Sequence, residues 1–90
     1  MYVHIGKDMV INSEEVIAIF NIEALEKKKK LEEVCKELKI SDKIIDVSDN
    51  NRKTLIICGK ESYIKKGYIT NISSATIAKR CNSNNNINKI

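Results

Sequence analysis

The sequence has no proline, no tryptophan, a single histidine and only three glycines, none adjacent to another, among its 90 residues. Isolated glycines cannot form the glycine-rich loop that cradles phosphates in nucleotide-binding proteins. A nucleophilic serine needs a neighbouring base, and His4 alone offers few such pairings; no serine lies in a GxSxG motif. A lone histidine without further ligands does not predict a metal site. These absences predict a protein without enzymatic activity, metal or cofactor.

Cysteine is also scarce. Cys35, Cys58 and Cys81 make an odd number, and no CxxC pair is present. The opening residues lack the basic segment and apolar run of a secretory signal. No apolar run approaches the roughly 18 residues that span a membrane. We therefore expect a cytoplasmic protein whose reduced thiols serve as small buried side chains, with no membrane partner.

Acidic residues are nearly missing from the second half of the chain. Residues 51–90 hold 8 Lys/Arg and 1 Asp/Glu, a formal charge of +7, whereas residues 1–50 hold 8 Lys/Arg and 11 Asp/Glu, a formal charge of −3. Such an asymmetry is typical of proteins with an anionic partner. It is also compatible with docking of the basic half of one copy onto the acidic half of another.

The order of apolar runs and turn signals predicts one α+β domain over residues 1–81 with a largely antiparallel sheet. The first two strands are expected to form a hairpin around a tight turn at residues 6–8. The uninterrupted apolar run at residues 16–20 predicts a strand covered on both faces. In order, the expected strands are residues 2–5, 9–12, 16–20, 43–47, 53–58 and 63–72, the last of them bent or turned at residues 66–67.

Two helices are expected. The longer covers residues 23–39, with a loop and a start near residue 28 as the alternative, because the lysines at residues 27–30 spoil its apolar face. We interpret these four lysines as a solvated surface balanced by nearby glutamates. A short helix that opens with a capping serine is expected over residues 73–81. The Asn-rich residues 82–90 cannot form a core and are predicted to be a disordered tail.

Cationic side chains are the main functional signal. Arginine and lysine supply most of the sequence-independent affinity for nucleic acids by releasing condensed counterions. No helix-turn-helix, zinc-finger or RNP motif is visible, so duplex DNA, RNA and a protein-interaction module all remain open. The cations of the second half that carry this signal are Arg52, Lys53, Lys60, Lys65, Lys66, Lys79 and Arg80, with Tyr63 and Tyr68 between them.

Several segments of the chain together resemble a known family. The opening MYVHIGKDMVINSEEVIAIF is followed by KIID, NRKTLII and ITNISSATIAKR. This order and spacing resemble those of RemB-type proteins, small relatives of the extracellular matrix regulator RemA of spore-forming bacteria. The resemblance covers residues 1–81. It implies a LytTR-like fold and a cytosolic, non-enzymatic DNA-binding transcriptional regulator of biofilm matrix and stress genes. Such proteins form ring-shaped oligomers or act as partners of a related regulator.

The resemblance also implies which residues contact double-stranded DNA. The family carries an arginine-rich stretch before a central strand, and the matching positions here are Arg52 and Lys53. A basic pair closes the last helix of the family, matched by Lys79 and Arg80. Lysine in place of arginine keeps the charge but not the bidentate geometry. The acidic pair at residues 14–15 stands where the family tends to carry an arginine.

Overall fold

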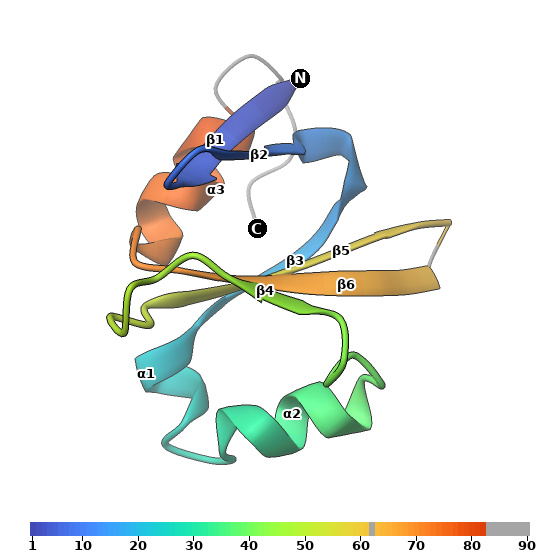
Figure 1. Ribbon diagram of the computed structural model, residues 1–90, viewed down its shortest axis with the longest axis vertical. Coiled ribbons are helices and arrows are strands. Elements are labelled where there is room, and N and C mark those ends of the chain that lie inside the picture. Colours follow the sequence, from blue (N-terminus) through green and yellow to red (C-terminus); the bar gives the residue numbers. More distant parts are fainter. Residues whose placement is uncertain (62, 83–90) are drawn as a thin grey trace.

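A computed structural model describes residues 1–61 and 63–82 of the chain. Figure 1 shows a central sheet between two outer layers. The sheet contains β3 (Val16–Asn21), β4 (Ile44–Asp46), β5 (Thr54–Lys60) and β6 (Tyr63–Thr70). One layer holds the hairpin of β1 (Tyr2–Gly6) and β2 (Met9–Asn12) with helix α3 (Ser74–Asn82). The other layer holds α1 (Ile22–Leu25) and α2 (Leu31–Glu37). The predicted α+β class and the predicted opening hairpin are therefore confirmed.

The central sheet is mixed, with the strand order β3-β5-β6-β4. β5 pairs antiparallel with both of its neighbours, as the prediction of a largely antiparallel sheet requires, and β6 is a single continuous strand. β4, however, pairs parallel with β6. To reach β5, the chain after β4 passes around the end of β6, where Val47 N donates to Ile69 O at 2.8 Å and Lys53 N donates to Thr70 O at 3.0 Å. This path places residues 47–53 at one end of the sheet.

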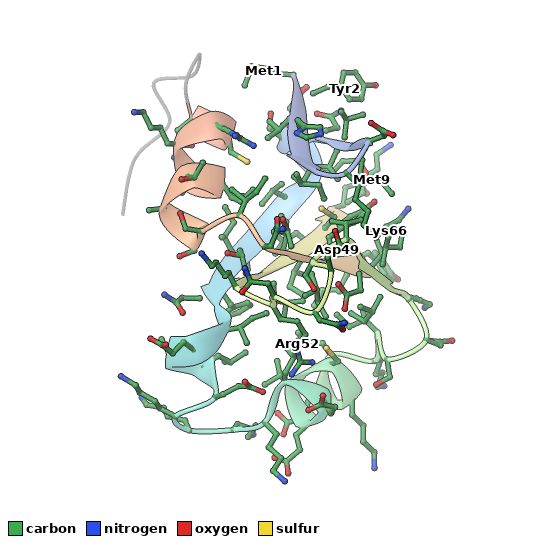
Figure 2. The ribbon with its side chains drawn as sticks, turned by 60° about the vertical axis from the view of Figure 1, so that its left-hand side comes forward. Met1, Tyr2, Met9, Asp49, Arg52 and Lys66 are labelled. Atoms are coloured by element: carbon green, nitrogen blue, oxygen red, sulfur yellow. The ribbon has the colours of Figure 1, made fainter. Side chains whose placement is uncertain are left out.

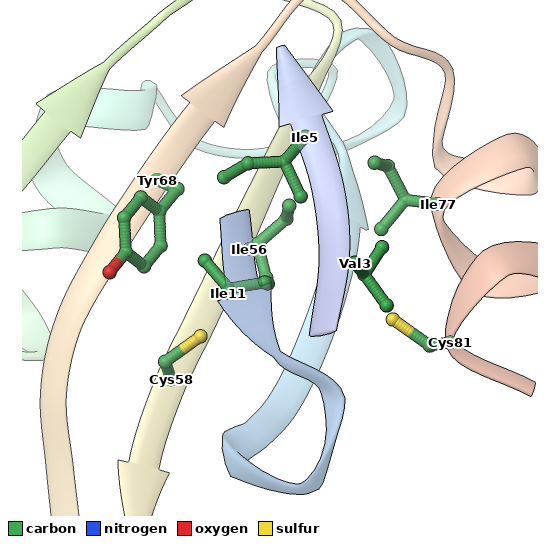
Figure 3. Packing of buried hydrophobic residues seen from close by; sticks show 8 residues of the cluster. All are labelled: Val3, Ile5, Ile11, Ile56, Cys58, Tyr68, Ile77 and Cys81. Carbon is green, nitrogen blue, oxygen red and sulfur yellow. The ribbon is translucent and has the colours of Figure 1, made fainter. Parts of the chain in front are cut away.

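The strand β5 is buried along nearly its whole length because both outer layers pack against it. Ile56 and Cys58 join the core cluster beneath the β1–β2 hairpin and α3, which Figure 3 shows at close range. Leu55 and Ile57 join the second cluster, with α1 and α2. Successive side chains of a strand point to opposite faces, so a strand covered on both faces needs a continuous apolar run. The sequence TLIIC has this property.

The predicted helix over residues 23–39 is wrong as a single element. The chain forms two short helices, α1 and α2, separated by a turn whose lysines at residues 27–30 are all exposed. A continuous helix would carry Lys27 and Lys28 onto the face that packs on the sheet, and burying two ammonium groups costs far more than one helical turn contributes. The break lets Leu31, only 1% exposed, start a new helix facing the core. The alternative start near residue 28 is closer to the observed Leu31.

The prediction that both faces of the third strand are covered is confirmed for most of the strand, because Val16 and Ile19 pack against the cluster beneath the hairpin and Ala18 and Phe20 pack against the cluster with α1 and α2. β3 is an edge strand, and Ile17 is 46% exposed. A continuous apolar run cannot distinguish a central strand from an edge strand that follows a bend, since both carry the same residue types. The short helix is confirmed within one residue at each end, with Ser73 Oγ accepting a hydrogen bond from Thr76 N at 3.2 Å. Of the predicted tail, Asn82 ends α3, and residues 83–90 lie outside the described residues.

Two buried threonines join the layers through side-chain hydrogen bonds. Thr70 Oγ1 donates to the carbonyl of Ile5 in β1 and accepts from Ile72 N at 3.1 Å. Thr54 Oγ1 donates to Ile72 O at 2.7 Å. Both threonines are 0% exposed. The hairpin layer is therefore tied to the sheet by polar bonds as well as by apolar packing.

Replacing Thr70 with valine is expected to lower the free energy of unfolding by about 2 kcal/mol, because valine keeps the shape but deprives a buried carbonyl of its donor. Urea denaturation followed by circular dichroism measures this change. Thr70→Ser keeps the hydroxyl and should lose less stability than Thr70→Val. Equal losses for the two variants would show that the hydrogen bond to Ile5 contributes nothing.

Candidate functional site

Arg52 lies in the loop between β4 and β5 and reaches the segment that carries α1 and α2 (Figure 2). Its Nη1 is 3.3 Å from Glu32 Oε2, and its Nη2 is 4.0 Å from Glu26 Oε2. The pKa of the Glu32 carboxyl is lowered, first by a hydrogen bond from its own backbone N–H and then by the Arg52 guanidinium. The Arg52 side chain remains 38% exposed. The guanidinium is thus oriented by two acids while part of its surface stays open to solvent.

The backbone that follows Arg52 is held at Lys53, by the sheet and by α1. Lys53 O accepts from Ile22 N at 2.9 Å, and Lys53 N donates to Thr70 O. The preceding turn contains Asp49 and Asn50 in the left-handed region, with φ of 53° and 66°. Asp and Asn tolerate this conformation better than most residues, which explains why the sequence SDNN predicted a loop here. The loop therefore presents Arg52 and Lys53 from a fixed backbone.

A shallow cavity of about 310 Å³ connects this loop with the start of α3. The N-terminus of a helix carries exposed N–H groups and a partial positive charge, which add to the field of the neighbouring cations. A single acid, Glu23, opposes them in this cavity. Its lining residues are Asn21, Glu23, Asn51, Arg52, Lys53, Ser73 and Ser74.

Lys79 and Arg80 lie in the last turn of the same helix, beside β1. Arg80 Nη1 donates to His4 O at 2.8 Å, so this arginine also fastens the helix to the hairpin. The imidazole of His4 in turn contacts the Lys7 carbonyl. Both Lys79 and Arg80 are exposed and border a second cavity, of about 450 Å³, between β1 and α3. Cations in a last helical turn also interact favourably with the helix dipole, which is a purely structural role for the pair.

The four cations that the family resemblance singles out lie near the two ends of α3. Ser73 and Ser74 line the cavity with Arg52 and Lys53, and Lys79 follows about 9 Å further along the helix axis at 1.5 Å per residue. We call this surface the α3 basic face; it consists of Arg52, Lys53, Lys79 and Arg80.

Lys66 does not belong to the α3 basic face. It lies on β6 with its Nζ 5.9 Å from the ring centroid of Tyr68, and it borders a cavity of about 200 Å³ beside Tyr2 and Val10. Figure 2 shows Lys66 near the hairpin and Arg52 beside α2, well apart. The side chain of Lys65 lies outside the described residues. A run of cations in the sequence thus separates in space once the sheet forms.

Sequence comparison supplies the family. The family model for RemA-like proteins, described as extracellular matrix regulatory protein A-like, matches residues 2–81, from β1 to the last turn of α3. The chain belongs to the RemA-like family. No curated protein matches it significantly. The family that the sequence segments indicate is therefore confirmed, whereas the match does not separate the RemA type from the RemB type. Both basic pairs of the α3 basic face lie inside the matched region.

The three thiols of this RemA-like chain are buried, as the sequence predicts, and none forms a disulfide. Burial raises the pKa of the Cys35 and Cys81 thiols, with a nearby Glu32 adding to the effect at Cys35. At Cys58 the pKa rises to about 11, mainly through burial and then through the charge of Glu15. A thiol becomes a good nucleophile as the thiolate, so these three are poorly reactive at neutral pH.

Other features of the RemA-like chain bear on partners. Within residues 1–61 and 63–82, no three His, Cys, Asp or Glu side chains gather in a group that could hold a metal ion. None of the helices in this described part has the length and apolar character that a bilayer crossing requires.

The sequence reasoning overlooked the two acids that orient Arg52. Glu32 is 20 residues away in the chain, and nothing in the local pattern links it to the loop. It also overlooked the bond between Arg80 and His4, which joins the two ends of the domain. A single sequence carries no signal for such long-range pairs.

Proposed function

We propose that this RemA-like protein is a non-enzymatic, cytoplasmic transcriptional regulator of matrix genes that binds double-stranded DNA through the α3 basic face. The observation that carries the proposal is the placement of Arg52 and Lys53 at the start of α3 and of Lys79 and Arg80 at its end, on a fixed backbone. Membership of an extracellular matrix regulatory family supports the regulatory role. The LytTR-like relationship stays a prediction.

The contacts would be mainly to phosphates. Cations that neutralise phosphates release condensed counterions, and each such contact contributes without regard to base sequence. Glu26 and Glu32 orient the Arg52 guanidinium, which reduces the side-chain freedom lost on binding but also offsets part of its charge. The loop backbone is anchored at Lys53 as well. Base readout or a narrow minor groove could add specificity through the arginine.

Assembly into an oligomer, ring-shaped as the family resemblance implies, belongs to the same proposal. The edge strand β3 leaves Ile17 exposed, and no charge or proline protects its sequence VIAIFN from pairing with another strand. Several copies of one weak basic face bind a long duplex far more tightly than one copy does. Light scattering coupled to gel filtration reports the mass in solution.

The test of DNA binding is a titration of duplex DNA between about 50 and 200 mM salt. Arg52→Ala is expected to weaken binding roughly 10-fold at the lower salt and to reduce the slope of log K against log salt by about 1. Arg52→Lys should keep most of the slope, because the charge remains. Lys43→Ala, which removes an exposed lysine next to β4, is the control and should leave binding nearly unchanged.

Two results would overturn the proposal. One is the absence of binding by the wild-type protein at low salt, and the other is an affinity that does not change with salt. The preference between DNA and RNA depends partly on aromatic side chains that can stack on bases: Tyr68 is only 7% exposed, whereas Tyr2 and Tyr63, at 74% and 75%, are accessible. Competition with single-stranded RNA in the same titration measures that preference directly.

A protein-interaction module is the second candidate, favoured by a specific observation. Four large apolar side chains of the described residues are more than 45% exposed, on the hairpin, β3 and β6: Tyr2 at 74%, Val10 at 52%, Ile17 at 46% and Tyr63 at 75%. Exposed aromatic side chains are enriched at protein interfaces. If the protein forms a defined oligomer or binds a related regulator but does not bind DNA at low salt, this second function is the better description.

A further inference from the structure

The turn between α1 and α2 carries four consecutive exposed lysines, which lie outside the α3 basic face. Lys27, Lys28, Lys29 and Lys30 are all exposed. The sequence predicts that neighbouring glutamates balance these charges. In the structure, Glu37 binds Lys29, with its Oε2 2.6 Å from Nζ.

The two nearest acids are directed at Arg52 instead. Glu26 precedes the lysines and Glu32 follows them, and each has a carboxylate oxygen within 4.0 Å of the Arg52 guanidinium. Among the described residues, no carboxylate lies within that distance of the ammonium group of Lys27, Lys28 or Lys30. Three positive charges of this turn therefore face solvent without a salt bridge.

Glu26 also fixes where the turn lies. Its Oε2 accepts from Leu31 N at 3.2 Å, which closes the turn from one end to the other, and the same oxygen lies 4.0 Å from Arg52 Nη2. Within the turn, Lys28 N and Lys29 N each donate to Leu25 O at 3.1 Å. The lysines are thus held next to Arg52 by bonds at both ends of the turn.

The turn continues the α3 basic face along the molecule. In Figure 1, α3, the loop between β4 and β5, and the α1–α2 turn follow one another down one side of the ribbon, and in Figure 2 Arg52 lies beside α2, at a height between α3 and this turn. The longest extent of the molecule is 33 Å, close to one helical turn of B-DNA, about 34 Å. A duplex lying along this side would meet cations over most of that length.

We propose that Lys27, Lys28 and Lys30 contact the phosphate backbone of the same DNA duplex that the α3 basic face binds. The inference rests on the proposed function and extends its footprint. Adjacent like charges without salt bridges repel one another, which the charge of Glu32 offsets in part at Lys30. A polyanion removes that repulsion and releases its own counterions at the same time.

The test compares two variants that lose the same charge. Lys27→Gln, Lys28→Gln and Lys30→Gln are combined in one protein. The control combines Lys36→Gln, Lys39→Asn and Lys43→Gln, which are exposed residues in α2 and the loop before β4. Asparagine is used at residue 39 because its φ of 61° lies in the left-handed region, which asparagine tolerates. Duplex DNA is titrated over the same salt range, and thermal unfolding is measured in parallel.

The first triple variant is expected to bind DNA at least 10-fold more weakly at low salt and to reduce the salt slope by about 2 to 3, at roughly 0.9 per lost phosphate contact. Its melting temperature should equal or exceed that of the wild type. The control should change the slope by less than about 1. Equal effects of the two triple variants would overturn the inference, because net charge alone would then explain them.

The outcomes separate the inference from the proposed function. If the wild type binds with a clear salt slope and Arg52→Ala weakens it, but the lysine variant behaves like the control, DNA binding stands and the lysine turn is excluded from it. If the wild type does not bind at low salt, both fail. A lysine variant that is less stable than the control would assign the turn a structural role instead.

Discussion

Substitution of Gly59 by alanine is expected to abolish stable folding of the domain. A methyl group at residue 59 would lie 1.7 Å from the carbonyl oxygen of Tyr63 and 2.6 Å from Cδ1 of Ile17. The first of these atoms belongs to the backbone of the paired strand β6 and cannot move aside as a side chain could. The register between β5 and β6 shifts at this point, which brings the two backbones so close. The expected loss, more than about 4 kcal/mol, is comparable with the whole stability of a domain this small.

Gly67→Ala provides the matched control. Its added methyl group would meet only the ends of flexible side chains, at 2.8 Å from Ile44 Cδ1 and 3.1 Å from Ile40 Cδ1. Those side chains can shift, so the expected loss is about 1–2 kcal/mol. Urea denaturation followed by circular dichroism, together with yield of folded protein, distinguishes the two variants. A Gly59→Ala protein as stable as Gly67→Ala would show that β5 and β6 separate more easily near Lys60 than the structure implies.

Alkaline pH is expected to destabilise the protein through Cys58. Burial raises the pKa of this thiol from 9.0 to about 11, and the charges of Glu15 and of an ionised Cys81 add to the rise. The charge of Lys66 opposes it. A group with a raised pKa in the folded state stabilises the fold fully below the unfolded pKa. That stability is lost as pH rises through the folded pKa, because the unfolded chain ionises first. The loss falls between pH 9 and about 11 and reaches about 2.7 kcal/mol for a shift of 2 pKa units.

The measurement is a series of urea unfolding curves at increasing pH for the wild type and for Cys58→Val. Valine has no proton to lose, so the variant should show a smaller decrease over this range. The ammonium groups of Lys7 and Lys29, whose pKa values are raised by hydrogen bonds to Asp49 and Glu37, also lose protons at alkaline pH. Their contribution to the pH dependence of stability is the same in both proteins and cancels in the comparison. Identical pH profiles would mean that the folded state admits the Cys58 thiolate without cost.

The strands and turns of this fold were largely predictable because they depend on local chemistry. The alternation in YVHI indicates a strand. The glycine before Lys7 and the asparagines after Ser48 indicate turns, because these residue types tolerate positive φ. The run TLIIC indicates a strand covered on both faces, and β5 is such a strand. In contrast, the parallel position of β4 beside β6 depends on how separate segments meet. No pattern within residues 43–47 contains that information.

The helical region shows where a local rule was overruled. Residues 23–39 have high helix propensity throughout and contain neither glycine nor proline. Propensity is worth only tenths of a kcal/mol per residue, whereas placing Lys27 and Lys28 against the sheet costs several times more. The chain therefore breaks the helix. The same break creates the exposed lysine turn and directs Glu26 and Glu32 to Arg52. The wrong helix prediction and the overlooked contacts of Arg52 with these two acids therefore have one cause.

The site was predictable only in part. Charge and family resemblance pointed to Arg52, Lys53, Lys79 and Arg80, and the structure places the first pair beside the start of α3 and the second pair in its last turn. The same criterion added Lys66, which lies near the hairpin instead. Counting cations along the chain cannot separate the two sides of a sheet.

The contacts that join the first strand to the last elements set the order in which the protein can be completed during synthesis. Ile5 is bonded to Thr70, 65 residues later, and His4 is bonded to Arg80, 76 residues later. The hairpin of β1 and β2 is synthesised before β5, β6 and α3, the elements that it packs against. Distant contacts of this kind also slow folding, because a long loop must close before they form. A nascent chain therefore acquires its basic face last, and a product truncated before α3 would expose the apolar side of the hairpin.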